Sequence, residues 1–292
     1  MGNPRVGARE RFRLLSMLTL ERHGDVTRVR MTSWRGRLVG YDVSAYLVRG
    51  VLVDTGFPRA ASDFSRFLDA YRLRGVMVTH WHEDHAGNAA LAATRGLPMT
   101  IAPETLAVLR EPMARSLRLY RRFVWGTALP VATSIVPFEH DALRAIHTPG
   151  HTSDHHVVWD DEQATLFSGD LFLGVKVRAT FPDEDPRLLV ATLRRIAALG
   201  PRRMFDAHRG LVPDAARVLS AKADWLEETI THIDAKIAAG WSDRAIRNHV
   251  LGRESAIGWL SRGEYSKLTF VRAVRGTAER AAGSEARGGA AQ

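Results

Sequence analysis

One stretch of six residues holds four side chains that can bind a metal ion: His80, His82, Asp84 and His85. The apolar run RGVMVTH, typical of a buried strand, leads into this stretch, and we expect a helix to begin near Gly87. Alternation at a strand end points His80 and His82 the same way, and Asp84 and His85 face the same cavity from the turn. Imidazoles and carboxylates that converge within about 2.0–2.2 Å of one point form a metal site. The pattern therefore predicts one here.

Three further candidate ligands follow the ends of later strand-like runs. His151 lies in HTPGHTSDHHVV, Asp170 ends LFSGD, and His208 lies in FDAHRG. The chain has no cysteine, which excludes thiolate metal sites, disulfides, iron–sulfur clusters and cysteine nucleophiles. Any metal ion must therefore be held by histidine, aspartate or glutamate.

The order and contexts of these residues resemble the metallo-β-lactamase superfamily. The resemblance covers residues from about 25 to 212 and rests on H-x-H-x-D-H followed, in order, by Gly-His, Ser-Gly-Asp and a final histidine. It implies an α/β fold, a four-layer αββα sandwich whose two sheets face each other and carry the metals at one edge. The layout is similar to that of glyoxalase II-like and quinolone-signal response-like members.

Carried over position by position, the resemblance assigns the ligands to two ions. One ion would be held by His80, His82 and His151. The second would be held by Asp84, His85 and His208, with Asp170 bridging both. Asp54, in VLVDTG, matches an early aspartate that braces the histidine loop, and His155 occupies a position where relatives often carry a supporting histidine. Two zinc ions per chain are the first choice, with iron or manganese as alternatives.

Such a site predicts hydrolysis. Two divalent ions can share one hydroxide, and each lowers the pKa of bound water towards about 7. We expect a metal-bridging hydroxide that cleaves a thioester or ester of a small anionic substrate, with Asp84 as the proton relay to the leaving group. The alternatives are an acyl-homoserine-lactone-type lactonase and a signalling or partner-binding member with incidental hydrolysis. Lactonases of this group usually place a tyrosine soon after the bridging aspartate, and LFLGVKVRATFPDEDP has none, which counts against a lactonase.

The positive charge bears on the substrate. The formal net charge is +9, from 41 Lys+Arg against 32 Asp+Glu, but the arginines are scattered and form no basic and aromatic stripe. A solvated basic surface is thus favoured over a nucleic-acid partner, and a small (thio)ester or lactone is the expected partner. Candidate substrate-binding residues at the pocket mouth are Arg118, Arg122, Phe172 and Lys176. For any one of the basic residues, solvation of an outer face is the simpler alternative, and Phe172 could equally belong to the core.

These residues must be positioned by a large domain. The chain has 292 residues, 45% of them hydrophobic, enough for one large domain with a smaller appendage. Short strand-like runs fill residues 26–54, including RLVGYDVSAYLVRG, with a hairpin turn at Arg49-Gly50. The expected divisions are a flexible arm (1–12), the metallo-β-lactamase-fold domain (13–212), a helical lid inserted at 103–130, a C-terminal helical region (213–275) and a disordered tail (276–292).

We see no targeting signal in the N-terminal sequence. Its apolar run from Leu14 to Leu20 is short and is followed by Glu21-Arg22 without a small-residue cleavage site. We therefore expect neither a signal peptide nor a membrane anchor, and a cytoplasmic location. A homodimer is compatible with the sequence.

Overall fold

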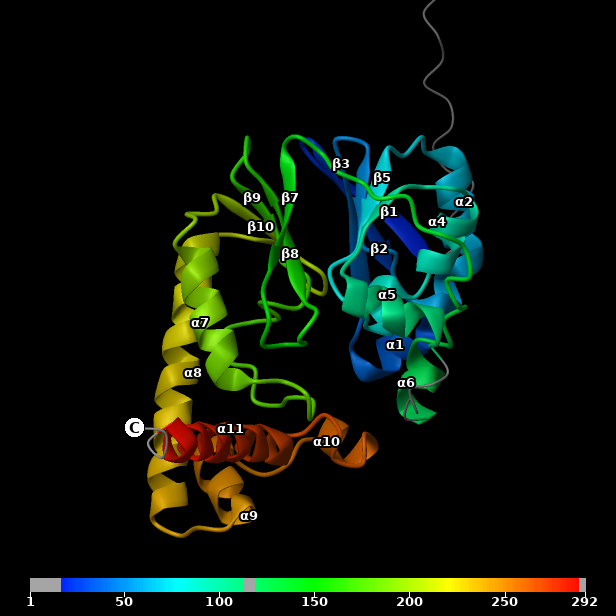
Figure 1. Ribbon diagram of the computed structural model, residues 1–292. Coiled ribbons are helices and arrows are strands. Elements are labelled where there is room, and N and C mark those ends of the chain that lie inside the picture. Colours follow the sequence, from blue (N-terminus) through cyan, green and yellow to red (C-terminus); the bar gives the residue numbers. More distant parts are fainter. Residues whose placement is uncertain (1–16, 113–118, 289–292) are drawn as a thin grey trace, which may run out of the picture.

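Two β-sheets face each other, and helices cover the outer face of each (Figure 1). The structure is a computed structural model that describes residues 17–112 and 119–288. The expected flexible arm at 1–12 lies outside the described residues. The layers follow the order helix, sheet, sheet, helix, so the predicted αββα sandwich is confirmed.

The first sheet has six strands in sequence order. They are β1 (Leu18–His23), β2 (Val26–Met31), β3 (Val43–Val48), β4 (Val51–Val53), β5 (Gly75–Met77) and β6 (Met99–Thr100). Strands β1 to β4 pair antiparallel, whereas β4, β5 and β6 run parallel. The predicted hairpin joins β3 to β4, and Arg49 (φ 51°) and Gly50 (φ 77°) are both left-handed, as a two-residue type I′ turn requires.

The second sheet has five strands in the order β11-β10-β9-β8-β7. They are β7 (Leu143–His147), β8 (His156–Asp160), β9 (Thr165–Phe167), β10 (Arg203–Asp206) and β11 (Gly210–Val212). Strands β9 and β10 are parallel, and the other neighbours are antiparallel. It follows that β7, β9 and β10 end at the same edge of this sheet.

Strands of both sheets bury both of their faces. In β9 and β10, Phe167 and Phe205 point between the sheets, while Leu166 and Met204 point to the outer helices. The same alternation in β3 sends Tyr46 between the sheets. The apolar runs that predicted strands are therefore explained by burial on two sides.

Helices complete the outer layers and the lid region. On the first sheet lie η1 (Pro58–Ala60), α2 (Ala61–Ala70), α4 (Ala89–Thr94) and α5 (Pro103–Arg110), and on the second α7 (Pro186–Ala197) and α8 (Ala215–Ala238). Asp185 begins α7, because its side chain accepts hydrogen bonds from the backbone N–H groups of Arg187 and Leu188. Of the lid expected at 103–130, α5 and α6 (Leu119–Val124) are helical, and residues 113–118 lie outside the described residues.

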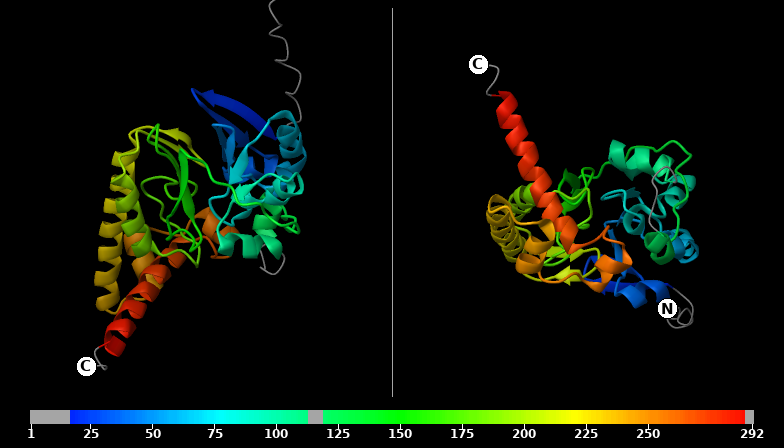
Figure 2. Two further views of the ribbon diagram at one scale, coloured as in Figure 1. Left: turned by 45° about the horizontal axis from the view of Figure 1, so that its top comes forward. Right: turned by 90° about the horizontal axis from the view of Figure 1, so that it is seen from below.

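The C-terminal region is helical, as expected from residue 213 onward. After α8 come α9 (Asp243–Ile246), the π-helical turn η2 (Arg247–Leu251), α10 (Ala256–Leu260) and α11 (Lys267–Gly288). Helix α11 lies below the second sheet and packs against α7 and α8, and its far end projects from the rest of the molecule (Figures 1 and 2). Among the described helices, none combines the length and the apolar character needed to cross a bilayer.

Two segments differ from the sequence-based expectation. The run expected to be strand-like from Arg37 begins within helix α1 (Trp34–Val39), because Ser33 caps its first turn and Gly40 (φ 76°) ends it. The tail expected to be disordered from residue 276 continues α11 as far as Gly288. That stretch is rich in alanine, glutamate and arginine, which are strong helix formers.

Candidate metal centre

The candidate ligands lie where strands of both sheets end. Asp54 follows β4, and His80 and His82 follow β5 in the first sheet. In the second sheet, loops after β7, β9 and β10 carry the later candidates, His151, Asp170 and His208. Because parallel strands end at one edge, these loops meet there. Asp84 and His85 lie in the short helix α3 (Glu83–Ala86) beside them.

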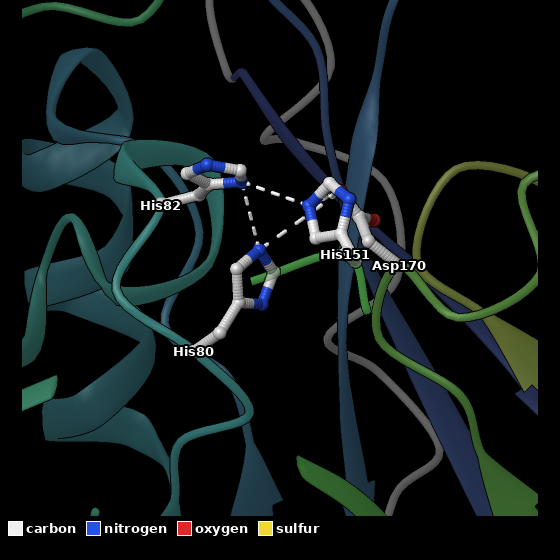
Figure 3. A group of neighbouring side chains, drawn as sticks. All are labelled: His80, His82, His151 and Asp170. Carbon is white, nitrogen blue, oxygen red and sulfur yellow. Dashed lines mark hydrogen bonds and ion pairs between the residues drawn. The ribbon is translucent and has the colours of Figure 1, made fainter. Parts of the chain in front are cut away.

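A first group of four ligand atoms comes from His80, His82, His151 and Asp170, all of them buried and all within 4.8 Å of one another (Figure 3). Nδ1 of His82 lies 2.9 Å from Nε2 of His80 and 3.0 Å from Nε2 of His151. Oδ2 of Asp170 is 3.4 Å from Nε2 of His151. Three imidazole nitrogens and one carboxylate oxygen thus converge on one point.

A second group lies on the other side of Asp170. It comprises Asp84, His85 and His208, again within 4.8 Å of one another. Oδ1 of Asp170 lies 3.2 Å from Nε2 of His85 and 3.3 Å from Nε2 of His208. Asp170 therefore presents one carboxylate oxygen to each group, the arrangement that a carboxylate shared by two ions needs.

The donor set fits divalent ions. Nε2 of His85 and Oδ1 of Asp170 are buried and lie 3.2 Å apart, but neither atom makes a well-formed hydrogen bond, so a bound cation would satisfy both. Burial lowers the pKa of His80 and His82 well below the usual imidazole value, so both rings are neutral and offer lone pairs. Burial alone would also lower the pKa of His208, but the carboxylates of Asp170 and Asp84 raise it to about 9. A cation would replace the proton in that second group.

Asp54 and His155 support the two groups. Oδ2 of Asp54 accepts hydrogen bonds from Nδ1 of His85 at 2.8 Å and from the Thr79 hydroxyl at 2.9 Å, and its Oδ1 accepts from Thr79 N. With its proton on Nδ1, His85 presents the lone pair of Nε2 to the site. Nε2 of His155 accepts from the backbone N–H of Asp170 at 3.1 Å, and its Nδ1 lies 2.8 Å from the Thr148 hydroxyl.

Sequence reasoning missed several residues at this centre. Oε1 of Glu184 lies 3.6 Å from Nδ1 of His151, and the backbone carbonyl of Asp42 lies 2.6 Å from Nδ1 of His208. Thr79 could have been identified from the sequence, because it directly precedes the histidine motif. Glu184 and Asp42 gave none, because they come from loops remote in sequence that only the fold brings near.

A cavity that is open to solvent lies above the ligands. His82, Asp84, His151, Asp170 and His208 form its floor. Its walls come from the loop after α1, from α6, from the loop after β9 and from the C-terminal helices. The wall residues are Tyr41, Tyr120, Arg121, Val124, Trp125, Leu173, Phe181, Ile257 and Tyr265.

Of the expected substrate-binding residues, the three that the structure describes, Arg122, Phe172 and Lys176, do not line this cavity. Phe172 is 4% exposed and packs in the core beneath α7 and α8. Lys176 is exposed to solvent and is not among the residues that line the cavity. Arg122 lies on the outer side of α6. One residue along a helix turns the side chain by about 100°, so Arg121 points inward and Arg122 outward. Arg118 lies outside the described residues.

Comparison with known proteins agrees with this geometry. The metallo-beta-lactamase superfamily profile matches residues 38–208, more than half of the chain. The chain belongs to the metallo-beta-lactamase superfamily. The family resemblance of the histidine and aspartate motifs is thereby confirmed.

Two curated relatives are each 27% identical to this chain over the aligned residues. A "Beta-lactamase-like protein 2 homolog" from Drosophila melanogaster is 27% identical over 213 residues, which cover 63% of this chain and 67% of the relative. An atrochrysone carboxyl ACP thioesterase from Paecilomyces divaricatus is 27% identical over 195 residues, covering 61% of this chain and 56% of the relative. The chain thus spans between about half and two thirds of the length of these relatives.

Solved members of the superfamily share the fold. A metallo-beta-lactamase family protein from Thermus thermophilus matches with a TM-score of 0.56 at 20% identity, covering 80% of this chain and 87% of its own. A metallo-beta-lactamase from Erythrobacter litoralis matches with a TM-score of 0.54 at 18% identity, covering 74% of this chain and 98% of its own.

Proposed function

We propose that this chain is a metal-dependent hydrolase that cleaves thioesters or esters. The observation that carries the proposal is the pair of ligand groups that share Asp170 on the floor of one cavity. Three imidazoles in the first group favour zinc, which we propose as the native metal, with two ions per chain.

Bound divalent ions supply Lewis acidity, which makes water nucleophilic at neutral pH and polarises a carbonyl group. The chain itself supplies orientation and proton transfer. Asp84 is 6% exposed and lines the cavity, and its Oδ2 lies 3.5 Å from Nε2 of His208. Its carboxylate is placed to hold a proton and pass it to the leaving group. The hydrogen bonds of Asp54 and His155 keep the ligand loops in position.

The comparisons support a thioester as the substrate class. Three of the curated relatives bear the name atrochrysone carboxyl ACP thioesterase, and one of them is 30% identical over 156 residues. A thiolate is a better leaving group than an alkoxide, so a site with one carboxylate as its proton relay suits thioesters well.

Lactone hydrolysis is the second candidate. No tyrosine follows Asp170 closely in sequence, but the fold brings Tyr41, Tyr120 and Tyr265 into the cavity lining. A phenol hydroxyl from one of these residues can replace the one expected after the bridging aspartate, as a donor to a lactone carbonyl.

The test is a hydrolysis assay on purified protein loaded with zinc, iron or manganese, using a panel of acyl thioesters, aryl esters and lactones. We expect thioester cleavage that a chelator abolishes and that His82→Ala and Asp84→Asn each lower by at least about a hundredfold. His249→Ala is the matched control, because His249 lies outside the cavity against Trp241. Equal rates for His82→Ala and the wild type would exclude the proposal, and a faster lactone rate would favour the second candidate.

A further inference from the structure

We infer that the cavity selects a neutral, planar acyl group, so that the preferred substrates are thioesters of hydroxylated aromatic acids. For the reaction this inference rests on the proposed function. For the shape and charge of the acyl group it rests on the cavity walls, which can be tested without hydrolysis.

One wall is a row of aromatic rings that begins at the second ligand group. The ring of Tyr41 lies edge-on to that of His208, with centroids 6.1 Å apart. The Trp125 ring lies 6.5 Å from that of Tyr41 at an interplanar angle of 68°. Phe57 supports Trp125 from behind at 5.3 Å. These spacings are those of favourable aromatic pairs, so the wall is preorganised.

A second aromatic wall begins at the first ligand group. The Phe181 ring lies 5.5 Å from that of His82, and Tyr265 packs on Phe181 at 4.8 Å. His82 and His208 lie on different sides of Asp170, so the two walls start from different ends of the ligand set. Between them lies a space faced by rings, which suits a flat acyl group whose carbonyl points at the floor.

The walls offer no free positive charge to an anionic acyl group. Among the described residues that line the cavity, Arg121 is the only arginine or lysine. Its Nη2 lies 2.6 Å from Oε2 of Glu83, and both side chains are buried. Its guanidinium also lies 5.0 Å from the centre of the Phe181 ring. Since Glu83 neutralises this cation, an anionic acyl group would be desolvated without a partner.

Phenol hydroxyls supply the polar contacts in this cavity. Tyr41, Tyr120 and Tyr265 line it, and burial together with the neighbouring Glu264 carboxylate raises the pKa of Tyr120, so its phenol stays protonated. A protonated phenol in the lining can donate a hydrogen bond to an oxygen of a bound ligand. A hydroxyl or keto substituent on the acyl ring provides that oxygen.

The experiment measures binding of three ketones that cannot be hydrolysed to the zinc-loaded full chain by calorimetry. The probes are 1-hydroxy-2-acetonaphthone, 2-dodecanone and 4-acetylbenzoate. We expect the hydroxynaphthyl ketone to bind about tenfold more tightly than either of the others, which lack the fused ring or add a charge. Equal or tighter binding of 2-dodecanone or 4-acetylbenzoate overturns the inference.

Variants locate the binding to the two walls. Tyr265→Leu and Trp125→Leu should each weaken binding of the naphthyl ketone by about tenfold, whereas Tyr265→Phe should keep the preference for the ring. Trp241→Leu is the matched control, an aromatic residue that is 38% exposed and outside the cavity. Unchanged affinity in both leucine variants, with melting temperatures showing that they fold, contradicts the inference.

The kinetic counterpart separates this inference from the proposed function. Hydroxynaphthoyl and dodecanoyl thioesters of N-acetylcysteamine should differ about tenfold in kcat/KM in favour of the ring. Equal hydrolysis of both would leave the proposed function intact and overturn the inference. Tight binding of the naphthyl ketone without hydrolysis of any thioester would support the inference about the cavity and overturn the proposed function.

Discussion

Arg121 and Glu83 form a buried ion pair, with Nη2 2.6 Å from Oε2, between helix α6 and the short helix α3, which carries the candidate ligands Asp84 and His85. Glu83 stands between His82 and Asp84 in the chain. The guanidinium of Arg121 also lies 5.4 Å from the centre of the Trp81 ring. These contacts attach α6 to the segment that carries the candidate ligands.

Removal of one partner of this pair should be strongly destabilising. Arg121→Met leaves the Glu83 carboxylate buried and unpaired, so we expect the free energy of unfolding to fall by about 3–5 kcal/mol. The double variant Arg121→Met/Glu83→Met should recover much of that loss. Urea unfolding in a double-mutant cycle measures both. The exposed pair Arg144 and Asp161, at 2.7 Å, is the control, and Arg144→Met should cost less than about 1 kcal/mol. Similar losses of unfolding free energy in Arg121→Met and Arg144→Met would show that the buried pair contributes no more to stability than the exposed one.

Asp54 should control metal affinity without binding the metal. In Asp54→Asn the amide oxygen can accept from Thr79 N, but the NH₂ group then faces Nδ1 of His85, which needs an acceptor. We expect zinc affinity, measured by competition with a chelator, to fall about 10- to 100-fold. Asp69→Asn, at an exposed pair with Arg95, should leave it unchanged. A wild-type affinity in Asp54→Asn would remove Asp54 from the supporting set.

Gly169 is required by its surroundings as well as by its backbone. It has φ +49°, and a Cβ there would lie 2.8 Å from Nε2 of His155, the residue that holds the Asp170 backbone. Gly96, with φ +69° and nothing within 4 Å, is a matched control. Gly96→Ala should cost about 1 kcal/mol, from the left-handed backbone alone. Gly169→Ala should cost more in chemical unfolding and also weaken zinc binding. Equal losses of stability in Gly169→Ala and Gly96→Ala would show that a Cβ at position 169 does not clash with His155.

Lys222 should make the free energy of unfolding rise with pH in the alkaline range. Its Nζ donates to the carbonyls of Leu171 at 2.8 Å and Phe172 at 2.6 Å, and burial lowers its pKa to about 8 from the usual 10.5. Between these values the unfolded chain binds more protons than the folded one, so stability rises with pH. Relative to Lys222→Met, the wild type should gain about 3 kcal/mol between pH 8 and pH 10.5 in urea unfolding. A constant difference across that range would show that the lysine titrates normally.

Much of the fold and of the ligand set could be predicted from local sequence. Apolar runs followed by histidine or aspartate mark strand ends, and strand ends of one sandwich edge meet in space, which is why His80, Asp170 and His208 could be linked across the chain. The hairpin at Arg49-Gly50 was equally local. Where short capping signals outweighed strand propensity, as at Ser33 before α1, the prediction was wrong.

The sequence by itself thus predicted the strand ends and the candidate ligands from residue chemistry and short-range periodicity, and its resemblance to a known superfamily supplied the family and the four layers. Only the tertiary structure decided what lines the cavity. Tyr41, Trp125, Phe181 and Tyr265 come from four separate segments, and the rotation of α6 places Arg121 inward and Arg122 outward. Such positions depend on how distant elements pack on one another, and no local pattern records that packing.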